Sequence, residues 1–172
     1  MPYANSKGVQ LYYEEAGKGF PIVFVHEFAG DLRSWEPQLR HFSRRYRCIA
    51  FNARGYSPSD VPEPVSKYSQ AIAADDIANV MRDLGVRKAH VIGCSMGGYA
   101  TLHFGLRYPQ MARSLTVIGA GYGSDPDKRA QFLRDTETMA RRFEELGTPE
   151  AISTYQIGPA RVQLQNKDPR AF

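Results

Sequence analysis

Short continuous apolar runs alternate with amphipathic segments through the first two-thirds of the chain. Four runs have the pattern of strands that are buried on both faces: PIVFVHE, YRCIAFN, KAHVIGC and SLTVIGA. Three segments between them place apolar side chains at helical spacing: SWEPQLRHFSRR, SQAIAADDIANVMRDLGV and residues 97–108. Ser34 is the expected N-cap of the first helix. The alternation predicts an α/β fold in which a mostly parallel sheet has helices on both faces.

Residues 9–17, VQLYYEEAG, add a further strand candidate, and we expect about six strands in total. The pattern changes after Gly123, where a long helical segment begins that Gly147 is expected to end. Thr148 and Pro149 fit the N-cap and the first position of another helix. We therefore expect two parts, an α/β core over residues 1–123 and a helical segment over residues 124–172.

Composition and charge argue against several classes of partner and cofactor. The 172 residues carry a formal net charge of +4, but the arginines are spread along the chain, and we expect no nucleic-acid partner. Cys48 and Cys94 lie in or beside apolar runs, which fits a reducing compartment. Without a signal-peptide pattern or a membrane-length apolar run, we expect a cytoplasmic protein with no membrane partner. The His and Cys residues lack ligand spacing, so we expect no metal and no cofactor.

The sequence GCSMG carries the strongest chemical signal. It places Ser95 between Gly93 and Gly97, after a predicted buried strand and before a predicted helix. In Gly-x-Ser-x-Gly a sharp turn lifts the serine hydroxyl clear of the sheet, and glycines on either side avoid a collision with the crossing backbone. The backbone N–H of Met96 then points into the same space and can stabilise an oxyanion. The context predicts a nucleophile elbow with Ser95 as the catalytic residue.

Together with HEFAG and FNARGYSPSD, which follow two earlier strands, the elbow resembles the α/β-hydrolase superfamily, in particular its serine-nucleophile branch of esterases, C–C hydrolases and cofactor-free haloperoxidases. The resemblance implies that Phe28 supplies the second oxyanion N–H and that His26 is structural. Glu27 stands where the family usually has glycine, and we expect its side chain to point outward. Asn52 replaces the family's usual aspartate, Arg54 is retained, and this segment is expected to brace the site.

The partners of the nucleophile are not found in the sequence. The family order is Ser, then an acid, then His, yet none of the four histidines follows Ser95 on a late loop. Asp125 is a weak candidate for the acid, because it also fits a helix N-cap before Pro126. The resemblance implies that residues 124–172 begin a helical cap and that the chain is the N-terminal portion of a hydrolase. We expect little activity from this chain alone.

The last predicted strand would leave an exposed sheet edge. We expect that a complementary polypeptide completes the sheet, that the strand pairs with a second copy of the chain, or that the cap segment covers the edge. The leading hypothesis is a serine hydrolase of a small-molecule ester or related acyl or carbonyl compound, whose identity the sequence does not indicate. A non-catalytic interaction module is the alternative. A third hypothesis, dinucleotide binding at GAGYGS, is disfavoured because Ser124 replaces the third glycine and no strand follows.

Overall fold

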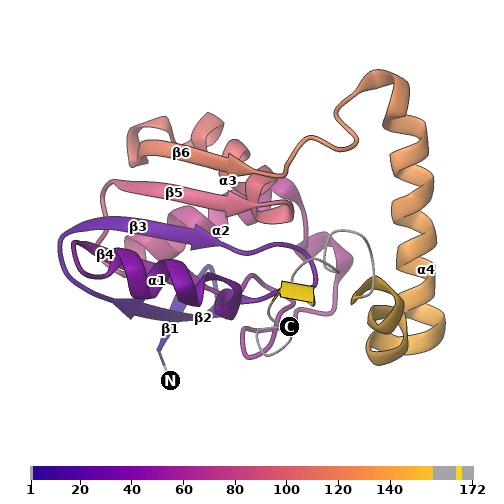
Figure 1. Cartoon of the computed structure of the whole chain (residues 1–172), viewed down its shortest axis with the longest axis horizontal. Helices are drawn as coiled ribbons and strands as arrows, with labels where there is room; N and C mark the ends of the chain where they lie inside the picture. The colour runs from indigo at the N-terminus through magenta and orange to yellow at the C-terminus, as the bar shows by residue number, and fades with distance from the viewer. Residues whose placement is uncertain (1, 157–165, 168–172) are drawn as a thin grey trace. The chain divides into compact units, whose positions relative to one another are not determined.

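The computed structural model describes residues 2–156 and 166–167, and it divides into two compact units, residues 1–120 and 121–172. The first unit is built on a six-stranded sheet with strand order β1-β2-β4-β3-β5-β6 (Figure 1). The strands are β1 (Tyr3–Ser6), β2 (Val9–Ala16), β3 (Phe20–Val25), β4 (Tyr46–Phe51), β5 (Ala89–Cys94) and β6 (Ala112–Ile118). The predicted α/β class with about six strands is confirmed.

Strands β4, β3, β5 and β6 run parallel, whereas β1 and β2 form an antiparallel hairpin that pairs with β4 through β2. The four parallel strands are the apolar runs that the sequence pattern identified. β1 was not predicted, because four residues with only two buried positions are too short to show a period.

Helices cover both faces of the sheet, as predicted (Figure 1). The 3₁₀-helix η1 (Leu32–Trp35) and α1 (Glu36–Phe42) cover one face, where Trp35 packs on Phe24 with ring centroids 5.1 Å apart. On the other face α2 (Gln70–Asp83) and α3 (Met96–Arg107) enclose the larger core, which includes Phe51 and Phe104. Two further 3₁₀-helices, η2 (Val65–Lys67) and η3 (Pro109–Met111), lie in connections.

The predicted N-cap at Ser34 is wrong. The helical turn begins earlier, as η1, and Asp31 caps it by accepting a hydrogen bond from the backbone N–H of Arg33 at 2.8 Å. An aspartate at this position competes well for the cap, and it leaves the Ser34 hydroxyl free for a different partner that is described below.

The second unit consists mainly of α4 (Pro126–Gln156), a helix that is interrupted at Gly147, whose φ of 75° and ψ of 167° are not helical. The break agrees with the predicted end of one helix and start of another. The predicted boundary at residues 123 and 124 and the cap role of this unit remain predictions. Part of the PARVQLQNKDPRAF tail lies outside the described residues.

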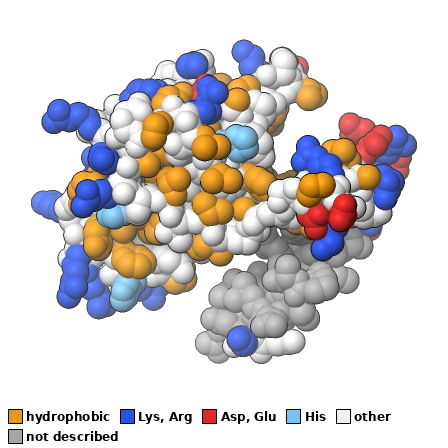
Figure 2. Space-filling view, turned by 90° about the horizontal axis from the view of Figure 1, so that it is seen from above, with side chains coloured by type: hydrophobic (Ala, Val, Ile, Leu, Met, Phe, Trp, Pro, Cys, Tyr) orange, Lys and Arg blue, Asp and Glu red, His pale blue; other side chains and the backbone are white. Residues whose placement is uncertain are grey.

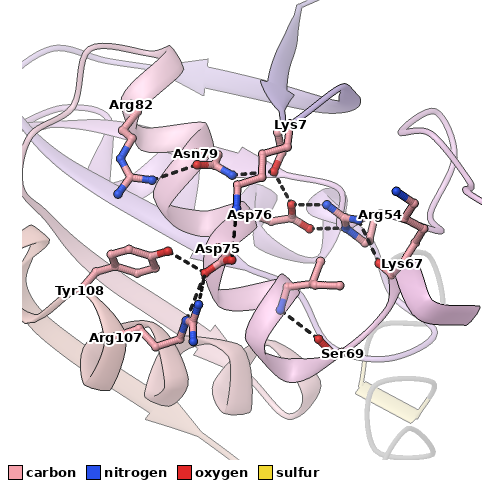
Figure 3. A network of polar contacts seen from close by, with 12 residues as sticks. Lys7, Arg54, Lys67, Ser69, Asp75, Asp76, Asn79, Arg82, Arg107 and Tyr108 are labelled. Carbon is pink, nitrogen blue, oxygen red and sulfur yellow. Dashed lines mark hydrogen bonds and ion pairs between the residues drawn. The ribbon is translucent and has the colours of Figure 1, made fainter.

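A buried ion pair connects three elements of the first unit (Figure 3). Arg54, in the loop after β4, donates from Nε and Nη2 to both carboxylate oxygens of Asp76 on α2, at 2.7 and 2.6 Å. The two side chains are 10% and 3% exposed. Ser6 of β1 donates to the same carboxylate at 2.5 Å and accepts from the Asn79 amide at 3.0 Å. The network therefore fixes the loop after β4, which borders the candidate site, against α2 and the hairpin.

We predict that Asp76→Ala lowers the free energy of unfolding by about 3 kcal/mol or more, because it leaves the Arg54 guanidinium buried without its partner. Asp75→Ala, at the adjacent position, is the matched control. Asp75 contacts the more exposed Lys7 and Arg107, so its loss is expected to cost about 1 kcal/mol. Urea unfolding followed by circular dichroism measures both, and equal losses would contradict the prediction.

Candidate active site around Ser95

Ser95 occupies the turn at which β5 ends and α3 begins. Its φ of 50° and ψ of −114° lie in a region that residues with a side chain rarely adopt, at a cost on the order of 1–3 kcal/mol. The Ser95 backbone N–H donates to the carbonyl of Ile118 at the end of β6 at 2.8 Å, and its carbonyl accepts from Tyr99 at 3.0 Å. Backbone bonds on both sides thus hold the strained conformation at the carboxyl ends of the parallel strands.

The two elbow glycines are required by close backbone approach. A Cβ on Gly93 would overlap the carbonyl of Gly97 and the hydroxyl of Thr101, and a Cβ on Gly97 would overlap the carbonyls of Val25 and His26. The first turn of α3 therefore lies directly against the end of β3 and the start of the following loop. This contact brings Met96 close to the start of the loop that carries Phe28, and the oxyanion hole itself remains a prediction.

His26 holds the start of that loop and is fully buried. Its Nε2 accepts from the backbone N–H of Ala53 at 3.0 Å, which places the proton on Nδ1, and Nδ1 donates to the Glu27 carbonyl at 2.8 Å. Both ring nitrogens are occupied by the backbone, so His26 is structural, as expected. Burial lowers its pKa, against smaller raising contributions from Glu27 and Asp31.

Glu27 is fixed by its own side-chain contact. Its carboxylate Oε1 accepts from the Ser34 hydroxyl at 3.0 Å, in η1, and lies in the space that a Cβ on Gly30 would occupy. The loop also places Ala29 at a φ of 57°. Glu27 thus turns toward η1 and helps to tie down the loop after β3.

Asn52 performs the bracing role that the sequence suggested. It is 2% exposed, accepts from the backbone N–H of Leu32 at 2.9 Å and donates to the carbonyl of Ser57 at 2.8 Å. Ser59 donates to the Asn52 carbonyl at 2.7 Å and accepts from the Tyr12 backbone at 2.8 Å. The loops after β3 and β4 are therefore joined through side-chain bonds to the backbone.

Tyr56 is a site residue that the sequence reasoning missed. Its ring packs edge-to-face on His26 with centroids 4.7 Å apart, and its hydroxyl donates to the Met96 sulfur at 3.7 Å. It thus contacts both His26, which holds the loop after β3, and Met96, the residue after Ser95. Its place in the FNARGYSPSD segment was the available signal, but nothing in the pattern distinguishes a site-facing tyrosine from a core one.

The structure places no histidine of this chain where it could serve Ser95. His26 is occupied as described, and His90 pairs through Nδ1 with the Ser114 hydroxyl at 2.6 Å near the opposite end of β5. His41 lies exposed in α1, and His103 is eight residues beyond Ser95 in α3, about 12 Å along the helix axis.

Asp125 has the contacts of a helix cap. Its carboxylate accepts from the backbone N–H of Asp127 at 3.1 Å and forms an ion pair with Lys128 at 3.7 Å, at the start of α4. Among the described residues no group of three or more His, Cys, Asp or Glu could hold a metal ion. No helix in the described ranges is long and apolar enough to cross a membrane.

Comparison with known proteins agrees with this geometry. A family model described as alpha/beta hydrolase fold matches residues 21–159. Epoxide hydrolase 3 of Mus musculus is 33% identical over 119 residues, which cover 68% of this chain and 32% of that protein. A protein of Azorhizobium caulinodans named as a carbamate hydrolase, RutD, is 31% identical over 151 residues, which cover 88% of this chain and 54% of that protein.

Solved structures of related hydrolases also resemble this chain. A structure titled as Est816, an N-acyl homoserine lactone degrading enzyme, has a TM-score of 0.69 and 28% identity over 99% of this chain and 68% of its own. An enol-lactonase from Burkholderia xenovorans LB400 has a TM-score of 0.79 at 19% identity over 96% of this chain and 63% of its own, which shows the fold alone. The matched part of the chain corresponds to 28–54% of the length of these curated relatives and of others like them.

We predict that Gly97→Ala lowers the free energy of unfolding by about 2 kcal/mol or more, because the new methyl group must displace the backbone at the end of β3. Gly98→Ala is the matched control one residue later. Its Cβ would meet the Ala120 Cβ at 3.0 Å and the carbonyl oxygens of Ile118 and Gly93 at 3.2 and 3.3 Å, all longer than the 2.2–2.6 Å contacts at Gly97. The higher helix propensity of alanine offsets part of this crowding. We expect a change within about 1 kcal/mol. Thermal and urea unfolding compare the variants, and equal effects would refute the close-approach argument.

His26→Gln is predicted to change the pH dependence of stability. The folded-state pKa of His26 is lowered, so the unfolded state binds more protons and the wild type loses stability as pH falls below about 6.5. The stability difference between wild type and variant is therefore largest above about pH 6.5 and shrinks toward pH 5. Urea unfolding between pH 5 and 8 measures it. His41→Gln, at an exposed position in α1, is the matched control for the loss of an imidazole.

Proposed function

The chain belongs to the α/β-hydrolase fold family, and on that premise we propose that it carries the nucleophile and the oxyanion hole of a serine hydrolase. The observation that carries the proposal is the strained conformation of Ser95 between β5 and α3, held by backbone hydrogen bonds on both sides. Strain of this kind persists where the surrounding structure enforces it, and it concentrates at active sites. The substrate is a small ester or a related acyl or carbonyl compound.

In this mechanism the Ser95 hydroxyl attacks the carbonyl carbon while a general base accepts its proton. The backbone N–H groups of Met96 and Phe28 stabilise the oxyanion of the tetrahedral intermediate. The intermediate collapses to an acyl-Ser95 ester as the leaving group departs with a proton. Water then hydrolyses the ester by the same route and restores the serine.

The relatives are named for different reactions, and a serine nucleophile is compatible with only some of them. Attack of Ser95 on an epoxide would open the ring and leave an ether between the serine and the substrate. An ether has no carbonyl for water to attack, so the enzyme would stop after one turnover, whereas an acyl ester is hydrolysed. The similarity to epoxide hydrolases therefore supports the scaffold, and Ser95 favours carbonyl substrates. The names of other relatives, a carbamate hydrolase and an N-acyl homoserine lactone degrading enzyme, agree with such a substrate.

The general base and its acid must come from polypeptide outside the described residues, and β6 marks where it would join. β6 is an edge strand, and six of its seven residues are exposed. Large apolar side chains are exposed along β6 and α3: Leu102, Leu106, Leu115, Val117 and Ile118. Figure 2, which looks at the molecule from above, shows orange hydrophobic side chains spread over this face. We propose that a complementary polypeptide pairs with β6 and supplies the acid and the histidine. Pairing with a second copy of this chain is the competing arrangement.

A non-catalytic interaction module is the second candidate, and the replacements at Glu27 and Asn52 are the observations that favour it. In that case the exposed β6 edge binds a partner that brings no histidine. Reactivity of Ser95 separates the two candidates.

We predict slow covalent labelling of the chain by a fluorophosphonate probe and complete loss of labelling in Ser95→Ala. Labelling is slow because no base assists the serine, and it accelerates when the complementary polypeptide is present. Cys94→Ala is the matched control, since it removes the adjacent nucleophile and should leave labelling unchanged. Intact-mass spectrometry measures the adduct. The same samples should not consume styrene oxide catalytically. Labelling that persists in Ser95→Ala would overturn the proposal.

A further inference from the structure

Six basic side chains gather where the parallel strands begin. They lie between positions 18 and 113 of the sequence, and the spread of the arginines led us to expect no nucleic-acid partner. The expectation of no membrane partner rested instead on the lack of a membrane-length apolar run. In the fold each precedes or begins a parallel strand, and the amino ends of parallel strands lie at one edge of the sheet. We call this set the basic pole: Lys18, Arg44, Arg45, Arg87, Lys88 and Arg113.

Contacts between the loops that carry these residues confirm that the loops are neighbours in space. The Gly17 and Gly19 backbones approach the carbonyls of residues 43, 45 and 46, so the loop of Lys18 lies against the loop of Arg44 and Arg45. His90, at the start of β5, contacts the ring of Phe20 at 5.2 Å and the hydroxyl of Ser114 on β6 at 2.6 Å. Figure 2 shows blue side chains gathered at the left, the end from which β3, β5 and β6 start in Figure 1.

The charge of the basic pole is not neutralised by neighbours. All six side chains are exposed, and within residues 2–156 none of them makes an ion pair. The loops that carry them, residues 17–19, 43–45, 84–88 and 108–113, contain no Asp or Glu. The remaining 16 basic residues face 18 acidic ones in the whole chain, so the excess positive charge of the protein resides at this pole.

Helix dipoles explain only part of the basic pole. α1, α2 and α3 end here, and cations near helix carboxyl ends are favourable. Each helix already has a basic residue in its last turn, Arg40, Arg82 and Arg107 respectively. Lys18 and Arg113 belong to no helix end, since one lies in the β2–β3 loop and the other in β6.

Large apolar side chains protrude at the same end of the molecule. Phe20 begins β3 and is 42% exposed, and Leu106, in the last turn of α3, is 74% exposed. Exposed apolar side chains among unpaired cations are typical of surfaces that bind anionic lipid, because the cations meet the headgroups while the apolar groups enter the interface.

We propose that the basic pole, with Phe20 and Leu106, docks this protein on an anionic phospholipid membrane. The contact is peripheral, since no described helix could cross a bilayer. Ser95 lies at the opposite, carboxyl ends of the strands and stays open while the pole is bound. The inference uses neither Ser95 nor the proposed oxyanion-hole residues. Leu106 and Arg113 belong to the exposed α3 and β6 surface described above, so the proposal is tested on the 172-residue chain without a complementary polypeptide.

The test is flotation of the 172-residue chain with vesicles of phosphatidylcholine alone or with 30% phosphatidylserine. We expect binding only to the anionic vesicles and a marked decrease between 50 and 500 mM NaCl. The quadruple variant Arg44→Gln, Arg45→Gln, Arg87→Gln and Lys88→Gln should bind about tenfold or more weakly. The matched control removes four charges from α4, through Lys128→Gln, Arg129→Gln, Arg134→Gln and Arg141→Gln, and should bind as the wild type does.

A second variant separates lipid from other polyanions. Phe20→Ser with Leu106→Ser should weaken vesicle binding several-fold and leave binding to a DNA duplex unchanged. Circular dichroism and thermal unfolding confirm that each variant is folded. Equal binding by the pole variant and the α4 control would overturn the proposal. Tighter binding to duplex DNA than to anionic vesicles, or vesicle binding unaffected by the loss of both apolar side chains, would also overturn it.

Discussion

The candidate site depends on one close approach, the contact of the first turn of α3 with the end of β3. The Val25 and His26 carbonyls lie where a Cβ on Gly97 would be, so the second residue of α3 can only be a glycine. That contact holds the turn in which Ser95 is strained and sets the position of the Met96 N–H relative to the loop of Phe28. Hydrogen bonds of His26 and Asn52 then stabilise the loop from the other side. Because protein interiors are close-packed, a shift at Gly97 would be transmitted to the backbone of Met96 and to the loop of Phe28, the two donors proposed for the oxyanion.

The sequence pattern predicted the parts of the fold whose signal is local. The four parallel strands follow from continuous apolar runs and the elbow from Gly-x-Ser-x-Gly after such a run. Long-range contacts carried no such signal. The pairing of Arg54 with Asp76 joins residues 22 positions apart, and Tyr56 reaches Met96 across 40 positions. Ser34 was assigned to a cap because a local rule favoured it, whereas its partner Glu27 is set by the path of the loop.

Parallel strand order also explains why the molecule has two chemically different ends. All four parallel strands deliver their following loops to one edge, which carries Ser95, His26 and Asn52. Their preceding loops reach the other edge, where the chain places cations and almost no acids. Charges that are distant in the sequence therefore add up in space, which is why spacing along the chain failed to indicate the basic pole. A charged surface of this kind acts over about 8 Å at physiological salt, so its field is largely screened at the opposite edge, where Ser95 lies.

The replacements at Glu27 and Asn52 bear on whether the site is vestigial, and their contacts argue against decay. Asn52 keeps the acceptor for the Leu32 N–H and adds a donor to the Ser57 carbonyl, so both of its polar groups are satisfied although the side chain is 2% exposed. Glu27 has a hydroxyl partner in Ser34, and the small Gly30 provides the space for its carboxylate. Each of these substitutions has a matching neighbour. The buried side-chain polar atoms that lack a partner among the described residues belong to other positions: Trp35, Gln38 and Thr101. The compensation therefore supports the proposed serine hydrolase over the non-catalytic module.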